Sequence, residues 1–174
     1  MLAKKALLII MFLVMLSGTA QAEWDFYFFG VNMKMIEQAD YKSVALGAVT
    51  SLAVHTAGHY AYAGLTGMHV KQDGFNEYSA SGYSAKRYRE FAQAGFVFQH
   101  AVGLLLTSIP ATRNTDFTRG YVGFALAETL TYPVVHRNEG DLCFSGENGG
   151  DRDMEYAAFM ALATHNVLRV KFYK

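Results

Sequence analysis

Two histidines stand four residues apart in the uncharged stretch "LAVHTAGHYAYAGL", residues 52–65. If this stretch is helical, His55 and His59 share a face, because residues four apart are neighbours on an α-helix. Two imidazoles in this arrangement can bind one metal ion, with zinc or iron as the expected metal. Further ligands are needed, because a zinc site uses three or four protein groups.

Other polar side chains in apolar segments are candidates for the remaining ligands. His100, Glu128 and His165 stand in three separate apolar segments. Polar groups are costly when they face an apolar environment, so we expect them to turn toward one another. The sequence therefore predicts a metal site that is built on His55 and His59 and completed by some of these three residues.

Two alternatives to a metal ion remain open for the histidines. Haem could be bound between two helices if His55 or His59 were paired with His100 or His165. Alternatively, the imidazoles and hydroxyls hydrogen-bond to one another and only fix the packing of the helices. In that case the protein is a structural or assembly component of an envelope complex and binds no metal.

The pentapeptide "HTAGH" (residues 55–59) resembles the H-E-x-x-H helix of zinc metallopeptidases, and especially the HExGH form of the membrane-embedded ones. The resemblance implies that His55 and His59 are zinc ligands. Thr56 stands where those enzymes have the glutamate that polarises the attacking water, and a hydroxyl cannot act as a general base near neutral pH. The similarity covers five residues, so hydrolysis would need a base from elsewhere, for which Glu128 is the candidate catalytic residue.

The first 22 residues have the three-part pattern of a secretory signal peptide. Lys4 and Lys5 form a basic head, an apolar run follows, and small residues end in Ala20-Gln21-Ala22. We therefore predict that residues 1–22 are a signal peptide and that residues 23–174 form a single helical domain. This places the protein in a bacterial cell envelope, in the inner membrane or the periplasm.

Four apolar segments, separated by polar connectors, predict an all-α fold: an up-and-down bundle of about four helices. They cover residues 43–70, 91–112, 120–135 and 156–168. The first two are long enough to cross a bilayer, which favours a membrane-embedded bundle with lipid and other envelope proteins as partners. A mean hydropathy of only +0.10 leaves a bundle outside the membrane as the alternative.

Composition excludes some classes of function. The 174 residues include 15 Lys and Arg and 15 Asp and Glu, and this balance gives no reason to expect a nucleic-acid partner. The single cysteine, Cys143, excludes an intramolecular disulfide. The glycine-rich acidic connector 136–153 is expected to be a solvated loop, with Asp151 or Asp153 capping the following helix.

Overall fold

The computed structural model describes most of the chain from residue 39 onward and two short stretches before it. The described ranges are 27–28, 31–32, 39–74, 77–79, 82–135 and 140–170. The predicted signal peptide, residues 1–22, lies outside them. Within the unit Met1–Gln38, strands β1 (Tyr27–Phe28) and β2 (Val31–Asn32) form an antiparallel hairpin.

The unit Ala39–Lys174 is helical, apart from a hairpin of strands β3 (Lys71–Gly74) and β4 (Glu77–Ser79). Its described helices are α3 (Tyr41–Thr66), α4 (Ala85–Ser108), α5 (Pro110–Arg113), α6 (Asp116–Val135), α7 (Asp141–Glu147) and α8 (Arg152–Leu168). The four long helices coincide with the four apolar segments, so the prediction of a helical fold is confirmed.

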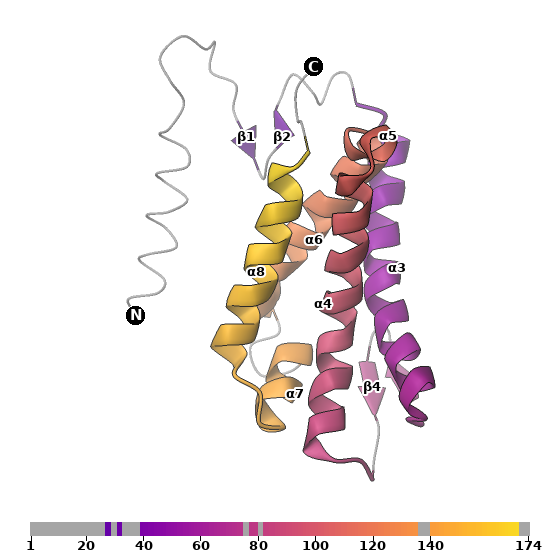
Figure 1. Cartoon of the computed structure of the whole chain (residues 1–174), viewed down its shortest axis with the longest axis vertical. Helices are drawn as coiled ribbons and strands as arrows, with labels where there is room; N and C mark the ends of the chain where they lie inside the picture. Colours follow the sequence, from indigo (N-terminus) through magenta and orange to yellow (C-terminus); the bar gives the residue numbers. More distant parts are fainter. Residues whose placement is uncertain are drawn as a thin grey trace. The chain divides into compact units, whose positions relative to one another are not determined.

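The four long helices alternate in direction (Figure 1). α3 and α6 run one way, and α4 and α8 run the other way. α3 packs against α6 and α4, and α8 packs against the same two helices. The parallel helices α3 and α6 are therefore neighbours, and α3 and α8 stand at opposite corners of the bundle.

Side-chain caps begin three of the long helices. The Asp40 carboxylate accepts from the backbone N–H groups of Lys42 and Ser43 at the start of α3. Ser84 caps α4, and Asp151 caps α8 by accepting from the N–H of Met154 at 3.1 Å. Each acceptor satisfies N–H groups that have no partner inside the helix. The prediction that Asp151 or Asp153 caps the last helix is confirmed for Asp151.

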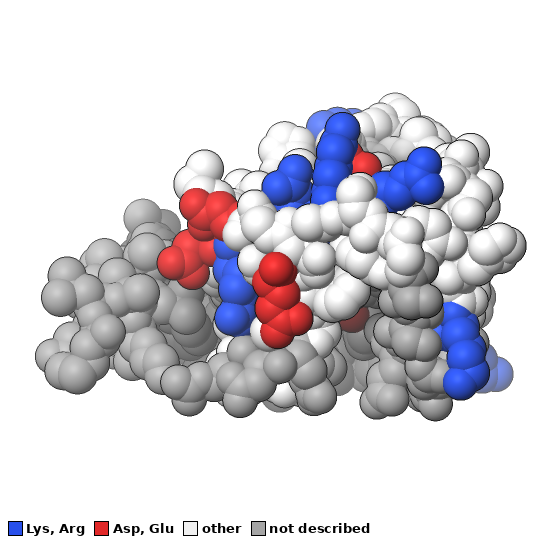
Figure 2. All heavy atoms as spheres, turned by 90° about the horizontal axis from the view of Figure 1, so that it is seen from below, with Lys and Arg blue, Asp and Glu red and all other residues white. Residues whose placement is uncertain are grey.

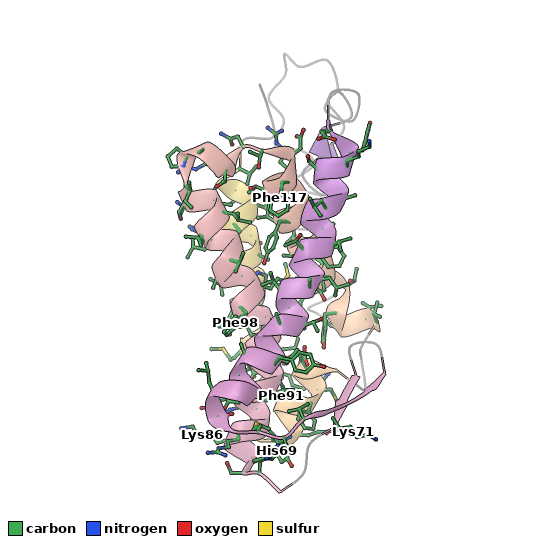
Figure 3. The ribbon with its side chains drawn as sticks, turned by 90° about the vertical axis from the view of Figure 1, so that its right-hand side faces the viewer. His69, Lys71, Lys86, Phe91, Phe98 and Phe117 are labelled. Carbon is green, nitrogen blue, oxygen red and sulfur yellow. The ribbon has the colours of Figure 1, made fainter. Side chains whose placement is uncertain are left out.

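Glycines allow α3 and α6 to touch backbone to backbone near their shared end. A Cβ on Gly47 would overlap the carbonyl oxygen of Phe117, and a Cβ on Gly120 would overlap that of Val44. Figure 3 shows Phe117 at this end of the bundle and Phe91, on α4, toward the other end. The first half of α3 thus packs backbone to backbone on α6. The second half of α3 packs closely on α4, where a Cβ on Gly58 would lie 2.6 Å from the carbonyl oxygen of Ala94.

The expectation of membrane-spanning helices is not met. Within the part of the chain that the structure describes, no helix combines the length and the apolar character needed to cross a bilayer. This applies to α3 and α4, which contain most of the two segments expected to span.

The connector expected to be a solvated loop is partly helical, so that prediction is wrong for Asp141–Glu147, which form α7. Leu142 of this helix is 5% exposed and packs in a cluster with Phe96, Tyr132 and Phe159. These four side chains come from α4, α6, α7 and α8 and form one buried cluster. α7 is therefore held against the core, and the side chain at its start has a fixed position.

Charged side chains of both signs lie at the surface. Figure 2, which views the molecule from below relative to Figure 1, shows Lys and Arg side chains alongside Asp and Glu. Lys86, near the start of α4, is exposed and lies 3.7 Å from Glu90. Figure 3 shows His69 near Lys71 and Lys86, at the hairpin end of the molecule. His69 is exposed.

Candidate metal centre

His55 and His59 lie inside the bundle on the face of α3 that meets α4. Their exposed fractions are 0% and 1%. Both rings fit because the facing residue of α4 is Gly95, where a Cβ would lie 2.6 Å from Nε2 of His55 and 2.5 Å from Nε2 of His59. The prediction that the two imidazoles share a buried face is confirmed.

The tautomer of neutral His59 is fixed by α4. Its Nδ1 lies 2.8 Å from the carbonyl oxygen of Phe91. A carbonyl oxygen only accepts hydrogen bonds, so Nδ1 carries the proton and donates it. The Nε2 atom of neutral His59 therefore presents a lone pair to the interior, which is the form of imidazole that binds metals.

Asp141, the first residue of α7, brings a carboxylate to both imidazoles. Its Oδ2 lies 2.9 Å from Nε2 of His55 and 3.3 Å from Nε2 of His59. The two Nε2 atoms are themselves 3.3 Å apart. The hydroxyl oxygen of Tyr132 accepts from the backbone N–H of Asp141, which anchors the start of α7. Three potential ligand atoms thus converge on one point, and this group can hold a metal ion.

The three ligand atoms need a shared proton or a positive charge among them. Asp141 Oδ2 and the Nε2 of neutral His59 are both acceptors, so their approach is unfavourable unless a positive charge lies between or beside them. His55 Nε2 lies 2.9 Å from Asp141 Oδ2 and 3.3 Å from His59 Nε2, so a proton on it can serve both acceptors. One metal ion would satisfy all three atoms together.

The charges of the cluster act on one another. Burial lowers the pKa of His55, but the hydrogen bond and negative charge of Asp141 outweigh it and raise that pKa above its usual 6.5. Glu128 and the Gln99 side chain add to this rise. Burial raises the pKa of Asp141, yet the hydrogen bonds and charges of the two histidines bring it well below its usual value of 3.8. The cluster therefore favours a cationic centre next to an anionic carboxylate.

The structure does not bring the other three predicted ligands into this cluster. His100 is 1% exposed, and its Nε2 lies 3.4 Å from Thr129 Oγ1. Burial and the charge of His55 lower the pKa of His100 to about 4. Within the described ranges, the group of ligand atoms that come within 4.8 Å of one another is that of His55, His59 and Asp141.

Glu128 and His165 have other partners. The Glu128 carboxylate accepts from the Nε2 of Gln99 at 2.6 Å. His165 is exposed, and its Nε2 lies 3.4 Å from Arg169. Since His165 faces outward and His100 faces Thr129, the described geometry gives no support to a haem held between two helices.

Sequence reasoning missed Asp141, although a signal was present. In an up-and-down bundle, the connector after the third helix returns to the end where the first helix finishes. His55 and His59 lie in the second half of the first helix, so an acid in connector 136–153 was within reach of them. Reading this connector as solvent-exposed removed its acids from consideration.

Comparison with known proteins identifies no family for this sequence. The sequence matches no family model, and searches of curated proteins and of solved structures give no significant match.

Proposed function

We propose that the protein binds one divalent transition-metal ion through His55 Nε2, His59 Nε2 and Asp141 Oδ2, with zinc or iron as the metal. The observation that carries this proposal is the triangle of ligand atoms with sides of 2.9, 3.3 and 3.3 Å. Ligands about 2.0–2.1 Å from a tetrahedral zinc ion are about 3.3 Å apart. Two sides already have this length, and the third needs to open by a few tenths of an ångström.

A three-ligand set leaves room for at least one water on the ion. Two histidines and one carboxylate with open positions occur in catalytic zinc sites and in non-haem iron sites. The Asp141 side chain is 17% exposed while both histidines are buried, so water can approach from the Asp141 side. This arrangement favours a centre at which small molecules can reach the metal.

The test is elemental analysis of the purified full chain, followed by titration with Zn²⁺ and Co²⁺. We expect about one equivalent of metal and, with Co²⁺, visible absorption in the range of a four- or five-coordinate ion. His55→Ala combined with His59→Ala should abolish both signals. His165→Ala is the matched control, because it removes an exposed histidine outside the cluster and should leave binding unchanged.

Asp141→Asn separates this proposal from a purely structural role. The variant keeps the size of the side chain but loses its charge, so metal affinity should fall strongly while the helices stay folded. If the wild-type chain binds no metal and Asp141→Asn only lowers the free energy of unfolding, the cluster is a buried ion pair that stabilises the bundle, and the proposal is wrong.

Export to the cell envelope remains a proposal based on residues 1–22. Lys4, Lys5 and the Ala20-Gln21-Ala22 sequence support it, because together they form the usual signal for secretion and cleavage. Sequencing the N-terminus of the protein recovered from the periplasmic fraction tests it, with Glu23 as the expected first residue. Recovery of an intact N-terminus in the cytoplasmic fraction would contradict it. Association with lipid or with other envelope proteins is likewise a proposal, and sedimentation of the protein with membranes tests it.

A further inference from the structure

Two buried polar atoms beside the proposed metal centre have no hydrogen-bond partner of ordinary geometry within the described residues. They are Nδ1 of His55 and Oε1 of Gln99. Gln99 is fully buried, as is His55. An unpaired buried donor or acceptor costs about 1–3 kcal/mol, so two such atoms in one place call for an explanation.

The orientation of the Gln99 amide follows from its other contacts. Its nitrogen lies 2.6 Å from Glu128 Oε2 and 3.1 Å from Ser51 Oγ. An ionised carboxylate can only accept, so the amide NH₂ must face Glu128 and the amide oxygen must point away from it. The oxygen of Gln99 is therefore an acceptor whose position is fixed by its neighbours.

The helix register places Gln99 within one turn of the His55 ring. Ser51, the partner of Gln99, lies one turn before His55 on α3. Gln99 itself lies one turn after Gly95, the residue of α4 that touches the His55 ring. His55 and Gln99 thus each carry an unpartnered buried polar atom, on neighbouring turns of α3 and α4.

We propose that Glu128, Gln99 and His55 form a hydrogen-bonded chain that orients the His55 ring for metal binding. His55 Nδ1–H donates to Gln99 Oε1, and the Gln99 amide donates to the Glu128 carboxylate. This inference rests on the proposed metal function. Metal-bound histidines almost always donate their second N–H to an acceptor, which fixes the tautomer and makes the other nitrogen a better ligand.

The hydrogen-bonded chain of Glu128, Gln99 and His55 gives Glu128 a role different from that of a catalytic base. Its carboxylate accepts a hydrogen bond from Gln99 instead of contacting a ligand atom, and hydrogen bonds in such a chain polarise one another. Negative charge on Glu128 makes the Gln99 oxygen a stronger acceptor and so makes His55 Nε2 a stronger ligand. Gln99 and Glu128 are therefore positioning residues for the metal.

The first experiment measures the affinity of the full chain for Zn²⁺, by competition with a chromophoric chelator. Gln99→Met keeps the length of the side chain but removes the acceptor, and we expect binding to weaken about 10- to 100-fold. Glu128→Gln keeps an acceptor for Gln99 but removes the charge, and we expect a smaller, several-fold loss. Glu155→Gln is the control, because this half-buried carboxylate accepts from Ser145 instead and its loss should leave affinity unchanged.

A rescue variant distinguishes positioning from general stability. Combining Gln99→Glu with Glu128→Gln exchanges the two groups, keeps the net charge and places an acceptor beside His55 again. We expect this double variant to bind Zn²⁺ at least as tightly as the wild-type chain, and more tightly than Gln99→Met. If Gln99→Met fails to fold, the exchanged pair and Glu128→Gln carry the test.

The outcomes separate the two proposals. If the wild-type chain binds no metal, the proposed function fails. The hydrogen bond itself is then tested by NMR, as a downfield Nδ1–H signal of His55 that Glu128→Gln shifts. If the wild-type chain binds Zn²⁺ and the variants of Gln99 and Glu128 bind it equally well, the chain of hydrogen bonds is overturned and the metal site stands.

Discussion

Gly95 and His59 pack so closely that a side chain at position 95 would displace the imidazole: a Cβ there would lie 2.5 Å from Nε2 of His59. Gly95→Ala should therefore weaken Zn²⁺ binding at least tenfold, because His59 and His55 must both move to make room. Overpacking of this kind costs about 1–3 kcal/mol, and part of that is offset by about 1 kcal/mol of improved helix propensity. Competition with a chelator and urea unfolding measure the two effects.

Gly64→Ala is the matched control for this substitution. Gly64 lies on α3, and a Cβ at that position would have no atom within 4 Å. We expect unchanged metal affinity and a free energy of unfolding that stays equal or rises by up to about 1 kcal/mol. Equal metal affinity in Gly95→Ala and Gly64→Ala would contradict the close fit around the histidines.

Metal binding should release a proton near neutral pH. The pKa of His55 is raised above 6.5 because Asp141 stabilises the imidazolium, so in the metal-free protein a proton occupies the centre below that pKa. A metal must displace this proton, and affinity should fall about tenfold per pH unit below the raised pKa. Calorimetric titration with Zn²⁺ in two buffers of different ionisation enthalpy measures the number of protons released. A value of zero at pH 6 would contradict the prediction.

The fold was predictable from the sequence because its signals are local. Apolar runs of helical length and the polar connectors between them are properties of neighbouring residues, and they indicate the four long helices. The cap of the last helix is equally local, which is why the sequence narrows it to Asp151 or Asp153. The face shared by His55 and His59 needed only the helical repeat of 3.6 residues.

The third ligand was not predictable from these signals, because it depends on tertiary packing. Asp141 stands in a glycine-rich acidic connector, and only the burial of Leu142 against the core turns this segment into a helix with a fixed start. The position of Gln99 beside the site could not be predicted for a similar reason. It is adjacent to His100, and which of the two faces α3 depends on how α4 is rotated against its neighbours.

His100 should stay neutral down to about pH 4. The pKa of His100 in the folded protein, about 4, lies below the usual 6.5. The contribution of neutral His100 to the free energy of unfolding is therefore fully present above pH 6.5 and is lost as the pH falls through 4. At about 1.4 kcal/mol per pKa unit, the loss is up to about 3 kcal/mol. Urea unfolding of the metal-free protein at pH 7.5, 6 and 4.5 measures it. His100→Gln should show a smaller acid loss than the wild-type chain, and an equal loss in both would contradict the assignment.

The contact between Gly120 and Val44 should control the stability of the bundle without affecting the metal centre. A Cβ at position 120 would overlap the Val44 carbonyl oxygen, which belongs to the backbone of α3 and cannot rotate away. Gly120→Ala should therefore lower the free energy of unfolding by about 1–3 kcal/mol. Gly123→Ala, one turn later on α6, meets no atom within 4 Å and should be neutral or slightly stabilising. Because this contact involves the first half of α3 and the histidines lie in its second half, the folded fraction of Gly120→Ala should bind Zn²⁺ with wild-type affinity. Weakened binding together with unchanged stability would show that the two halves of α3 do not act separately.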